Sequence, residues 1–486
     1  MLMLIALVLS LLAGVLALCV TFRPWIGWVS AISAAGVLGL GIALCVATSS
    51  HHTLSALHGT LRADSLSSFM VVVIGTVSLL ATLQTPRVMG REIAEGTTTA
   101  RRASTYVALM QAFITCMLTA VLTANLGVLW VAIEATTIAT TFLVSHHRTR
   151  RALEASWKYV ILCSVGIALA FLGTVLIYYA ALHTGHGVST ASLNWTSLMA
   201  IAPHLNHGVV RLAITLLVLG YGTKVGLAPT HSWLADAHSQ APAPVSALMS
   251  GVLLTVAFYA LLRFKAIADA ALGIAFPRAL FIIVGLLSLL VATIMLIAQR
   301  DLKRMLAYSS VEHMGLLALG AAAGSSLAIG AVLLHMLGHG LTKSTLFISS
   351  GEIAHAEGTT EIAKITALLA RRPTLGALFG CGLLALLGLP PFSLFVSELT
   401  MARAEVTAGL WWVVVISLAL LSVIFVAITN HARHVLLGGD GSPGVALKAR
   451  TVVISLSSAL VVCAVIGVSS WPLLSLLRAA AHVVAP

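Results

Sequence analysis

Residues 222–229 read Gly-Thr-Lys-Val-Gly-Leu-Ala-Pro, and this stretch decides how the chain must fold. It closes an apolar run that begins at Leu212, so Lys224 and Pro229 both fall inside a segment suited to a membrane. An ammonium group at bilayer depth is penalised by roughly 2.5 to 3.5 kcal/mol even on lenient insertion scales. Proline inside a helix removes a backbone hydrogen bond, and unsatisfied backbone at that depth is tolerated only inside protein or beside water. The stretch therefore predicts a broken membrane helix that carries a buried, functional cation.

The composition of the whole chain is that of a membrane protein. Hydrophobic residues make up 59% of the 486 residues and charged residues 9%, whereas a soluble domain carries about 25% charged residues. A membrane-spanning helix needs about 20 apolar residues, and about fourteen stretches of suitable length occur. They lie near residues 2–20, 25–48, 66–86, 104–123, 126–144, 158–182, 210–229, 243–264, 275–298, 305–323, 325–350, 374–401, 409–430 and 451–478. We predict an all-α polytopic membrane protein with about 14 transmembrane helices, forming a single membrane domain over residues 1–486.

The net charge of +12 follows the predicted topology and gives no indication of nucleic-acid binding. If the N-terminus is outside and the loops alternate, all lysines and arginines except Lys224 and Lys343 divide into 18 inner and 7 outer residues, as the positive-inside rule expects. The inner residues are Arg23, Arg87, Arg91, Arg101, Arg102, Arg148, Arg150, Arg151, Lys158, Arg300, Lys303, Arg304, Lys364, Arg371, Arg372, Arg433, Lys448 and Arg450. The outer residues are Arg62, Arg211, Arg263, Lys265, Arg278, Arg403 and Arg478. Both termini are predicted to face outward.

A second break resembles the first. Residues 388–391 read Gly-Leu-Pro-Pro, against Gly-Leu-Ala-Pro at 226–229, and an acidic residue follows the last proline by seven positions in each case, Asp236 and Glu398. Interrupted helices at matching places in two halves of a chain are the usual sign of an inverted repeat with an ion path at the break. We predict a first repeat over 104–264 and a second over 275–430, each of five helices. Chance similarity of two Gly/Pro breaks is the alternative.

Ionisable residues inside other apolar stretches are the candidate site residues. Glu134 lies near the middle of its span, and Lys224 lies at a similar depth. Desolvation opposes ionisation of a buried carboxylate, whereas a nearby ammonium favours it. Sequence position therefore makes Lys224 the natural partner of Glu134. A neutral structural carboxyl at Glu134 and a snorkelling side chain at Lys224 are the alternatives.

Three further polar residues recur at four-residue intervals, namely His335, His339 and Lys343, so that they line one face of a helix. Imidazoles titrate near neutrality, and a row of them can pass protons. Structural histidines are one alternative. A metal site is another, but a third ligand of suitable spacing is missing from the sequence, and no metal ligand is assigned.

The residues beside the two breaks have less certain roles. His231, Asp236 and His238 follow the first break and either relay protons or fold the re-entrant loop. Glu398 either lies on an exit path or pairs with Arg403, five residues further on. The six cysteines lie in apolar stretches without Cys-x-x-Cys spacing, which is typical of small buried side chains and not of an iron–sulfur site.

Several motifs together give a family resemblance. They are Ala-Ile-Glu-Ala-Thr-Thr at 132–137, Leu-Glu-Ala-Ser-Trp-Lys-Tyr at 153–159, Gly-Thr-Lys at 222–224 with Trp-Leu-Ala-Asp-Ala-His-Ser at 233–239, Arg-Asp-Leu-Lys-Arg-Met-Leu-Ala-Tyr-Ser-Ser-Val-Glu at 300–312, and Gly-Leu-Pro-Pro-Phe at 388–392 with Ser-Glu at 397–398. The chain resembles, over nearly its whole length, the antiporter-like membrane subunits of respiratory complex I, Mrp-type sodium/proton antiporters and membrane-bound hydrogenases. It looks most like the hydrogenase-4 component F, or formate hydrogenlyase, group.

The resemblance implies fourteen core helices, a Glu134–Lys224 pair, and a polar axis continued by Lys343 and Glu398. Thr255 stands where many complex I relatives carry a second lysine, so His335 and His339 either fill the connection or the axis is interrupted. The resemblance also implies a proton-translocating membrane subunit of a multi-subunit hydrogenase, without a cofactor of its own. Nickel–iron and iron–sulfur centres are expected in soluble partner subunits. An Mrp-type sodium/proton antiporter subunit, an NADH-quinone oxidoreductase membrane subunit and a passive scaffold are the alternatives.

Overall fold

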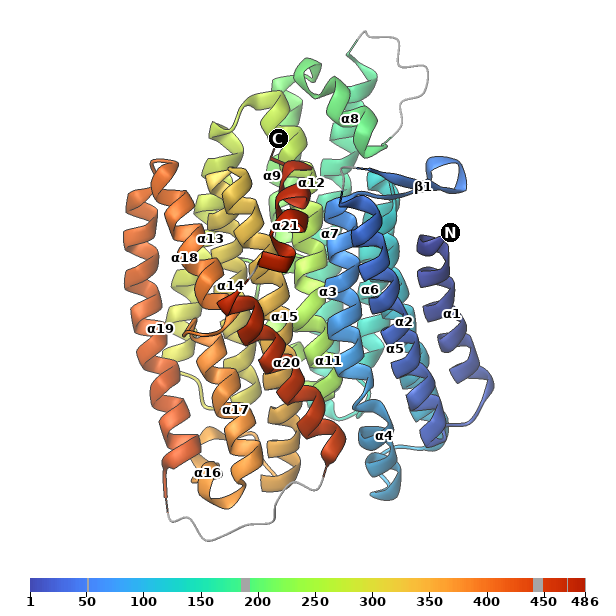
Figure 1. Ribbon diagram of the computed structural model, residues 1–486, viewed down its shortest axis with the longest axis vertical. Helices are drawn as coiled ribbons and strands as arrows, with labels where there is room; N and C mark the ends of the chain where they lie inside the picture. The colour runs from blue at the N-terminus through green and yellow to red at the C-terminus, as the bar shows by residue number, and fades with distance from the viewer. Residues whose placement is uncertain (50–51, 185–192, 440–448, 470, 486) are drawn as a thin grey trace.

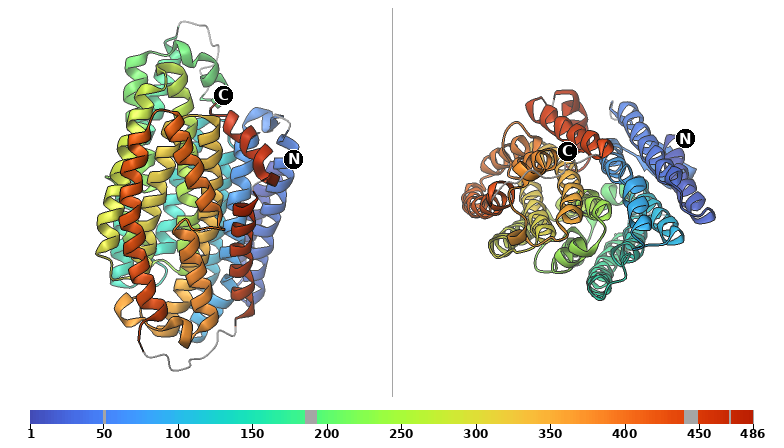
Figure 2. Two further views of the ribbon diagram at one scale, coloured as in Figure 1. Left: turned by 60° about the vertical axis from the view of Figure 1, so that its left-hand side comes forward. Right: turned by 90° about the horizontal axis from the view of Figure 1, so that it is seen from below.

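The protein is a bundle of long, roughly parallel helices in the computed structural model (Figure 1). The structure describes residues 1–49, 52–184, 193–439, 449–469 and 471–485. Seen end-on, the first two helices lie at one edge of the bundle and α19 lies at the opposite edge (Figure 2). Among the predicted inner basic residues, Lys448 lies outside the described residues.

The described residues form helices almost throughout. The α-helices are α1 (Leu2–Cys19), α2 (Pro24–Thr48), α3 (Ser65–Thr82), α4 (Thr85–Ala94), α5 (Ala100–Leu122), α6 (Leu126–Val144), α7 (Arg150–Leu182), α8 (Trp195–Ile201), α9 (His207–Val225), α10 (Trp233–Gln240), α11 (Ala243–Leu248), α12 (Leu254–Leu272), α13 (Ala275–Ile297), α14 (Leu302–Ala323), α15 (Ser326–Glu357), α16 (Leu368–Arg371), α17 (Pro373–Leu386), α18 (Ser393–Thr407), α19 (Trp411–Leu437), α20 (Arg450–Val468) and α21 (Trp471–His482). The shorter elements are the antiparallel strands β1 (Leu54–Ala56) and β2 (Leu61–Ala63), the 3₁₀ turns η1 (Leu57–Gly59), η2 (Ala202–His204) and η4 (Ile362–Lys364), and the π-helical turn η3 (Met249–Leu253) between α11 and α12.

The predicted all-α membrane architecture is confirmed. Each of the fourteen apolar stretches coincides with one helix or with a consecutive set of helices. Eleven of the described helical segments are long and apolar enough to cross a membrane. Helices α14 and α15, of 22 and 32 residues, are also long enough, but their polar side chains keep them outside that group.

The polar helices are at the centre of the bundle. Every residue from Ala331 to Ser350 of α15 is buried, and so is every residue from Met305 to Ala323 of α14. The outer helices α1, α2, α7, α13 and α19 instead expose large apolar side chains such as Ile32, Val165 and Ile283. Apolar residues therefore face outward and polar residues inward, as expected where lipid replaces water around a bundle.

Both predicted breaks are present. Helix α9 stops at Gly226, whose φ of 85° is in the left-handed region that favours glycine, and the chain becomes helical again at α10. Helix α17 ends before Gly388, with φ of 60°, and α18 begins at Ser393. The shared pattern of glycine, a few turn residues and a new helix agrees with two related units, although the inverted repeats over 104–264 and 275–430 stay a prediction.

The two ends of the bundle differ in charge. The N- and C-termini lie at the end that carries the β1–β2 hairpin, and α4 and α16 lie at the other end (Figure 1). At the α4 end, Glu352 pairs with Arg87 and Arg91 at 3.0 and 3.3 Å, and Glu357 pairs with Arg371 and Arg372. These arginines belong to the group predicted to face inward.

A buried ion pair anchors the opposite end. Asp64 caps α3 by accepting from the Ser67 N–H, and Arg263 of α12 donates to both of its carboxylate oxygens at 2.8 and 2.7 Å. Burial opposes ionisation of Asp64, but the Arg263 guanidinium and the Ser67 N–H outweigh it and hold the pKa of that carboxyl below its ordinary value. The pair joins α3 to the central α12.

Removing one partner of this pair leaves a buried charge without compensation. We expect Asp64→Asn to destabilise the protein by about 3–5 kcal/mol, measured as a lowered thermal transition in detergent. Since the pKa of Asp64 is lowered in the folded state, its contribution is present above the ordinary aspartate pKa and is lost as pH falls through the folded-state value. Stability of the wild type should therefore fall more steeply with acidification than that of Asp64→Asn.

Glu154→Gln is the matched control, because it removes a carboxylate from the exposed pair with Lys158. Surface pairs contribute little, so this variant should unfold like the wild type. Equal transitions for Asp64→Asn and Glu154→Gln would contradict the anchoring role.

Candidate functional site

Polar side chains from seven helices meet inside the bundle. Helix α10 packs against α7 and α14, α7 packs against α6 and α9, and α15 packs against α14 and α18. These contacts bring most of the predicted site residues into two groups, and His231, Asp236 and His238 lie outside both. One surrounds Lys224, and the other surrounds Lys343 and the histidines of α15.

Lys224 is fully buried and held by hydroxyl groups. Its Nζ donates to Thr137 Oγ1 at 2.8 Å and to Tyr159 OH at 2.6 Å, and it lies 4.9 Å from the centroid of the Tyr159 ring. No carboxylate oxygen of the described residues lies within 4.0 Å of Nζ. The ammonium is therefore stabilised by two hydroxyl groups and by the face of the Tyr159 ring, in place of a direct ion pair.

The predicted partners Glu134 and Lys224 are not in direct contact in this structure. Glu134 Oε2 instead accepts from the Thr137 hydroxyl at 3.2 Å, and Oε1 accepts from Ser164 at 2.9 Å. Glu134 and Thr137 lie three residues apart on one face of α6, and Thr137 occupies the place beside the lysine that the carboxylate was expected to fill. The two charges are thus joined through one hydroxyl, which accepts from Lys224 and donates to Glu134.

His238 lies between the two groups. The rings of Tyr159 and Trp233 are tilted by 55° with centroids 4.9 Å apart, the ring centroids of Trp233 and His238 are 6.3 Å apart, and His238 stacks on Phe347 at 5.2 Å. His238 is fully buried, neither of its ring nitrogens has a hydrogen-bond partner, and the charges of Lys343 and Lys303 act on it. Because a buried imidazole without partners is costly, this position suits a water that would link the two groups.

Lys343 occupies a site of the same kind as Lys224. It is fully buried, and its Nζ donates to the Leu306 carbonyl at 2.8 Å and to the Ser309 hydroxyl. Both acceptors belong to α14, and Ser309 lies about one turn before Glu312. The charge of Glu312 acts on Lys343, and Glu312 Oε2 is buried without a partner.

The row of histidines gains a further member, His313, which was not among the predicted site residues. His335 Nε2 lies 3.1 Å from His313 Nδ1 of α14, and the rings of His313 and His339 have centroids 5.1 Å apart. His335 Nδ1 also contacts Ser397 Oγ of α18 at 2.9 Å, and His339 Nε2 contacts the Ser250 carbonyl at 3.2 Å. The predicted four-residue spacing is confirmed as one face, and this face is turned toward α14.

Glu398 lies at the second break, beside the histidines. Its Oε1 is 4.0 Å from His313 Nδ1, and no pairing with Arg403 occurs among the described residues. The carboxylate packs directly on Gly388, where an added Cβ would overlap Glu398 Oε2. The glycine therefore serves two purposes, since it permits the positive φ of the break and admits the carboxylate.

Asp236 and Glu398 have different surroundings although each follows its proline by seven residues. Asp236 pairs with Lys158 Nζ at 3.2 Å and with Arg304, and these partners are partly exposed. His231 is half-buried, and its Nδ1 has no partner. Asp236 and His231, which were predicted either to relay protons or to fold the loop, form no hydrogen bond or ion pair with Lys224 or Lys343. The charge of Lys343 does act on His238.

Thr255 donates to the Val252 carbonyl at 2.9 Å and contacts none of the axis residues through a hydrogen bond. The connection through His335 and His339 expected in its place extends from Lys343 toward Glu398. It does not extend from Lys224 toward Lys343. That second interval is occupied by Trp233 and His238.

Cavities lie at the Glu398 end of the chain of polar groups and near the α4 end of the bundle. Two of them, of about 290 and 390 Å³, are lined by Glu398, and the second also touches Glu312. A third, of about 130 Å³, is lined by Glu92, His147 and Lys303 near the α4 end. The carboxylate oxygens of Glu92 there lie 3.2 Å from His146 Nε2 and 3.1 Å from His147 Nε2, at hydrogen-bonding distance.

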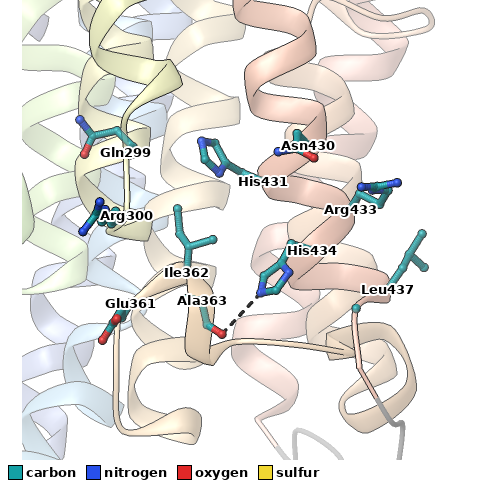
Figure 3. Close-up of a pocket in the computed structure, with 11 residues that line it drawn as sticks. Gln299, Arg300, Glu361, Ile362, Ala363, Asn430, His431, Arg433, His434 and Leu437 are labelled. Atoms are coloured by element: carbon teal, nitrogen blue, oxygen red, sulfur yellow. Dashed lines mark hydrogen bonds between the residues drawn. The ribbon is translucent and has the colours of Figure 1, made fainter.

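A cavity of about 800 Å³ lies away from these groups, between the α13–α14 connection, η4 and the end of α19 (Figure 3). Arg300, Arg433 and His434 line it, and His434 Nε2 lies 3.5 Å from the Ala363 carbonyl. It contains none of the buried lysines, histidines or carboxylates described above, so its size does not make it the functional centre.

Several of the residues that hydrogen-bond to the buried charges were not identified from the sequence. Thr137, Tyr159, Ser164 and Ser309 look like ordinary helix residues, and only the packing of separate helices brings them to the charges. The signal for His313 was present, because Glu312 and His313 are adjacent inside the apolar stretch 305–323.

Comparison with known proteins gives the family. Residues 123–424 match the family model described as NADH:quinone oxidoreductase/Mrp antiporter, TM. The chain belongs to this family. It is 41% identical over 336 residues to the hydrogenase-4 component F homolog of Methylacidiphilum infernorum, covering 69% of this chain and 70% of the relative. It is also 33% identical over 390 residues to NADH-quinone oxidoreductase subunit N of Desulforudis audaxviator, covering 78% of this chain and 73% of that one.

Solved structures share the fold. A chain of the membrane-bound sulfane sulfur reductase, an archaeal respiratory membrane complex, superposes with a TM-score of 0.87 at 24% identity, covering 99% of this chain and 97% of the other. A chain of the Mrp complex from Dietzia gives 0.85 at 20% identity, covering 99% and 96%. The predicted antiporter-like membrane-subunit fold is thereby confirmed.

The contact between Gly388 and Glu398 generates a prediction. Gly388→Ala should destabilise the protein by about 1–3 kcal/mol for the left-handed backbone alone, with a further loss from displacing the carboxylate. Gly409→Ala is the matched control, since Gly409 has a φ of 79° and an added Cβ there would meet nothing within 4 Å. Thermal unfolding in detergent should show a larger loss for Gly388→Ala, and equal losses would contradict the packing of Glu398 on this glycine.

Proposed function

We propose that the chain is the proton-translocating membrane subunit of a multi-subunit, hydrogenase-type respiratory complex similar to formate hydrogenlyase. The observation that carries the proposal is the hydrogen-bonded sequence Lys224–Thr137–Glu134, in which one hydroxyl separates a buried ammonium from a carboxylate. The pKa of the Lys224 ammonium depends on the charge of Glu134, and one unit of pKa corresponds to only about 1.4 kcal/mol. A modest rearrangement at Glu134 is therefore enough to release a proton.

Lys224 acts as the switch in this proposal. While Glu134 is ionised, Thr137 transmits its charge and Lys224 stays protonated. When Glu134 is neutralised or drawn away, desolvation favours the neutral amine. The proton then leaves past Tyr159 and a water at His238 to Lys343, and from there through His339, His335 and His313 to Glu398.

The cavities suggest where protons enter and leave. The cavity lined by Glu92, His147 and Lys303 at the α4 end is assigned to the entry side, and the charge of Lys303 acts on His238, so this cavity approaches the path between the two lysines. Exit is assigned to the cavities at Glu398. His231 and Asp236 serve at most the entry side, because Asp236 pairs with partly exposed lysine and arginine.

The setting follows from the same proposal. The protein lies in the cell membrane with its α4 end on the cytoplasmic side, because that end carries the basic residues predicted to face inward. Both termini face outward. Nickel–iron and iron–sulfur centres belong to soluble hydrogenase-type partners, which supply the energy. The relatedness to a hydrogenase-4 component F homolog supports this choice over an NADH-quinone oxidoreductase subunit.

Proton uptake by vesicles containing the purified complex tests the switch. Lys224→Met should abolish coupled uptake while the complex still assembles, because the only titrating group at that position is lost. Lys364→Met is the matched control, since Lys364 pairs with Glu361 on the surface, and it should transport like the wild type. Undiminished uptake by Lys224→Met rejects the role.

The hydroxyl link has its own test. Thr137→Val removes the group between Lys224 and Glu134 and should lower the rate of uptake by at least tenfold, whereas Thr137→Ser keeps the hydroxyl and should retain most of it. Equal rates for the two variants would show that the charges communicate by another route. Uptake driven by a sodium gradient and indifferent to hydrogen or formate would instead favour an Mrp-type antiporter subunit.

A further inference from the structure

Three histidines from two helices form a compact nitrogen-rich cluster inside the bundle. One ring nitrogen from each of His313, His335 and His339 lies within 4.8 Å of the others, and all three side chains are fully buried. Adjacent ligand atoms on a tetrahedral zinc ion are about 3.3 Å apart, since zinc–nitrogen bonds measure about 2.0–2.1 Å. The His313–His335 separation of 3.1 Å matches this spacing, and the wider spacings must contract on binding.

The neighbours of two histidines fix which nitrogens are free to bind. The Ser397 hydroxyl donates to the Leu394 carbonyl, so it accepts from His335 Nδ1–H, and Nε2 of His335 is left with a lone pair that faces His313. A carbonyl can only accept, so His339 Nε2–H donates to Ser250, and Nδ1 of His339 is a buried lone pair without a partner. Metal-bound histidines are usually oriented in this way by a hydrogen bond from the second ring nitrogen.

A fourth ligand and an access route are present. Glu398 Oε1 lies 4.0 Å from His313 Nδ1, and a carboxylate completes a set of three imidazoles well. The cavities of about 290 and 390 Å³ that Glu398 lines connect this side of the cluster to space outside the packed core.

Some charges near the histidine cluster oppose the binding of a cation and others favour it. Lys343 lies one turn from His339 and repels a cation, whereas Glu312 and Glu398 attract one. The ammonium of Lys343 is directed at Leu306 and Ser309 of α14, away from the imidazoles. Its repulsion therefore weakens binding of a divalent ion without blocking it.

We propose that His313, His335, His339 and Glu398 form a binding site for a divalent transition-metal ion of the zinc type. Imidazole nitrogens and one carboxylate suit zinc and cobalt and do not suit magnesium or calcium. The binding itself is independent of proton transfer. If the proposed function holds, a bound ion also occupies the nitrogens that pass protons from Lys343 to Glu398, and so blocks the exit side.

Titration of the purified full-length chain with Co²⁺ tests the site. Visible absorption bands typical of tetrahedral cobalt should appear and saturate at one ion per chain, and Zn²⁺ should displace them. Replacement of a ligand, in His313→Asn or His339→Asn, should remove the bands. Ser397→Ala, which frees His335 from its orienting partner, should weaken binding by about 10–100-fold.

Two variants guard against misfolding and binding elsewhere. Lys343→Met removes the repelling charge and should tighten binding by at least about tenfold, which an unfolded protein cannot do. His147→Asn removes a histidine of the separate Glu92 cluster and should leave the cobalt bands unchanged. Absence of the bands in the wild type, or bands that survive in His313→Asn and His339→Asn, overturns the proposal and leaves a hydrogen-bonded histidine chain only.

Discussion

The structure depends on how it accommodates an ammonium group in its interior without a carboxylate in contact. Lys224 is placed by a helix that must stop at Gly226, and its charge is met by the hydroxyls of Thr137 and Tyr159. A direct ion pair would hold the proton too firmly to release it, and an apolar pocket would expel it altogether. The hydroxyl between Lys224 and Glu134 gives an intermediate coupling, which is the property that a protonation switch requires.

The second half of the chain repeats this solution with different neighbours. Lys343 is also solvated by neutral acceptors, and its continuation is a histidine cluster that ends on Glu398 at the second break. Four rings in contact, Tyr159, Trp233, His238 and Phe347, lie between the two lysines, and His238 is the one imidazole among these four. Neither ring nitrogen of His238 has a hydrogen-bond partner, so His238 is the place where the proposed path lacks a continuous set of hydrogen bonds.

The sequence predicted the architecture well because lipid imposes simple rules. Length and hydropathy located fourteen apolar stretches, and glycine with proline located both breaks, since each signal is local along the chain. It failed where helix packing decides the outcome. Glu134 and Thr137 lie three residues apart on α6, and the packing of that helix determines which of them contacts Lys224. The register of α14 against α15 brings His313 to His335. Asp236 and Glu398 also have different surroundings despite equal spacing from their prolines, because α10 directs its carboxylate to a partly exposed pair and α18 directs its own inward.

An experimental map of the assembled complex that resolves ordered water is the most direct measurement of continuity along this path. We expect water at His238, within hydrogen-bonding distance of its ring nitrogens and linked to the surroundings of Tyr159 on one side and Lys343 on the other. Dry, close-packed apolar contacts around His238, with no water between the two lysines, would contradict transfer of a proton from Lys224 to Lys343.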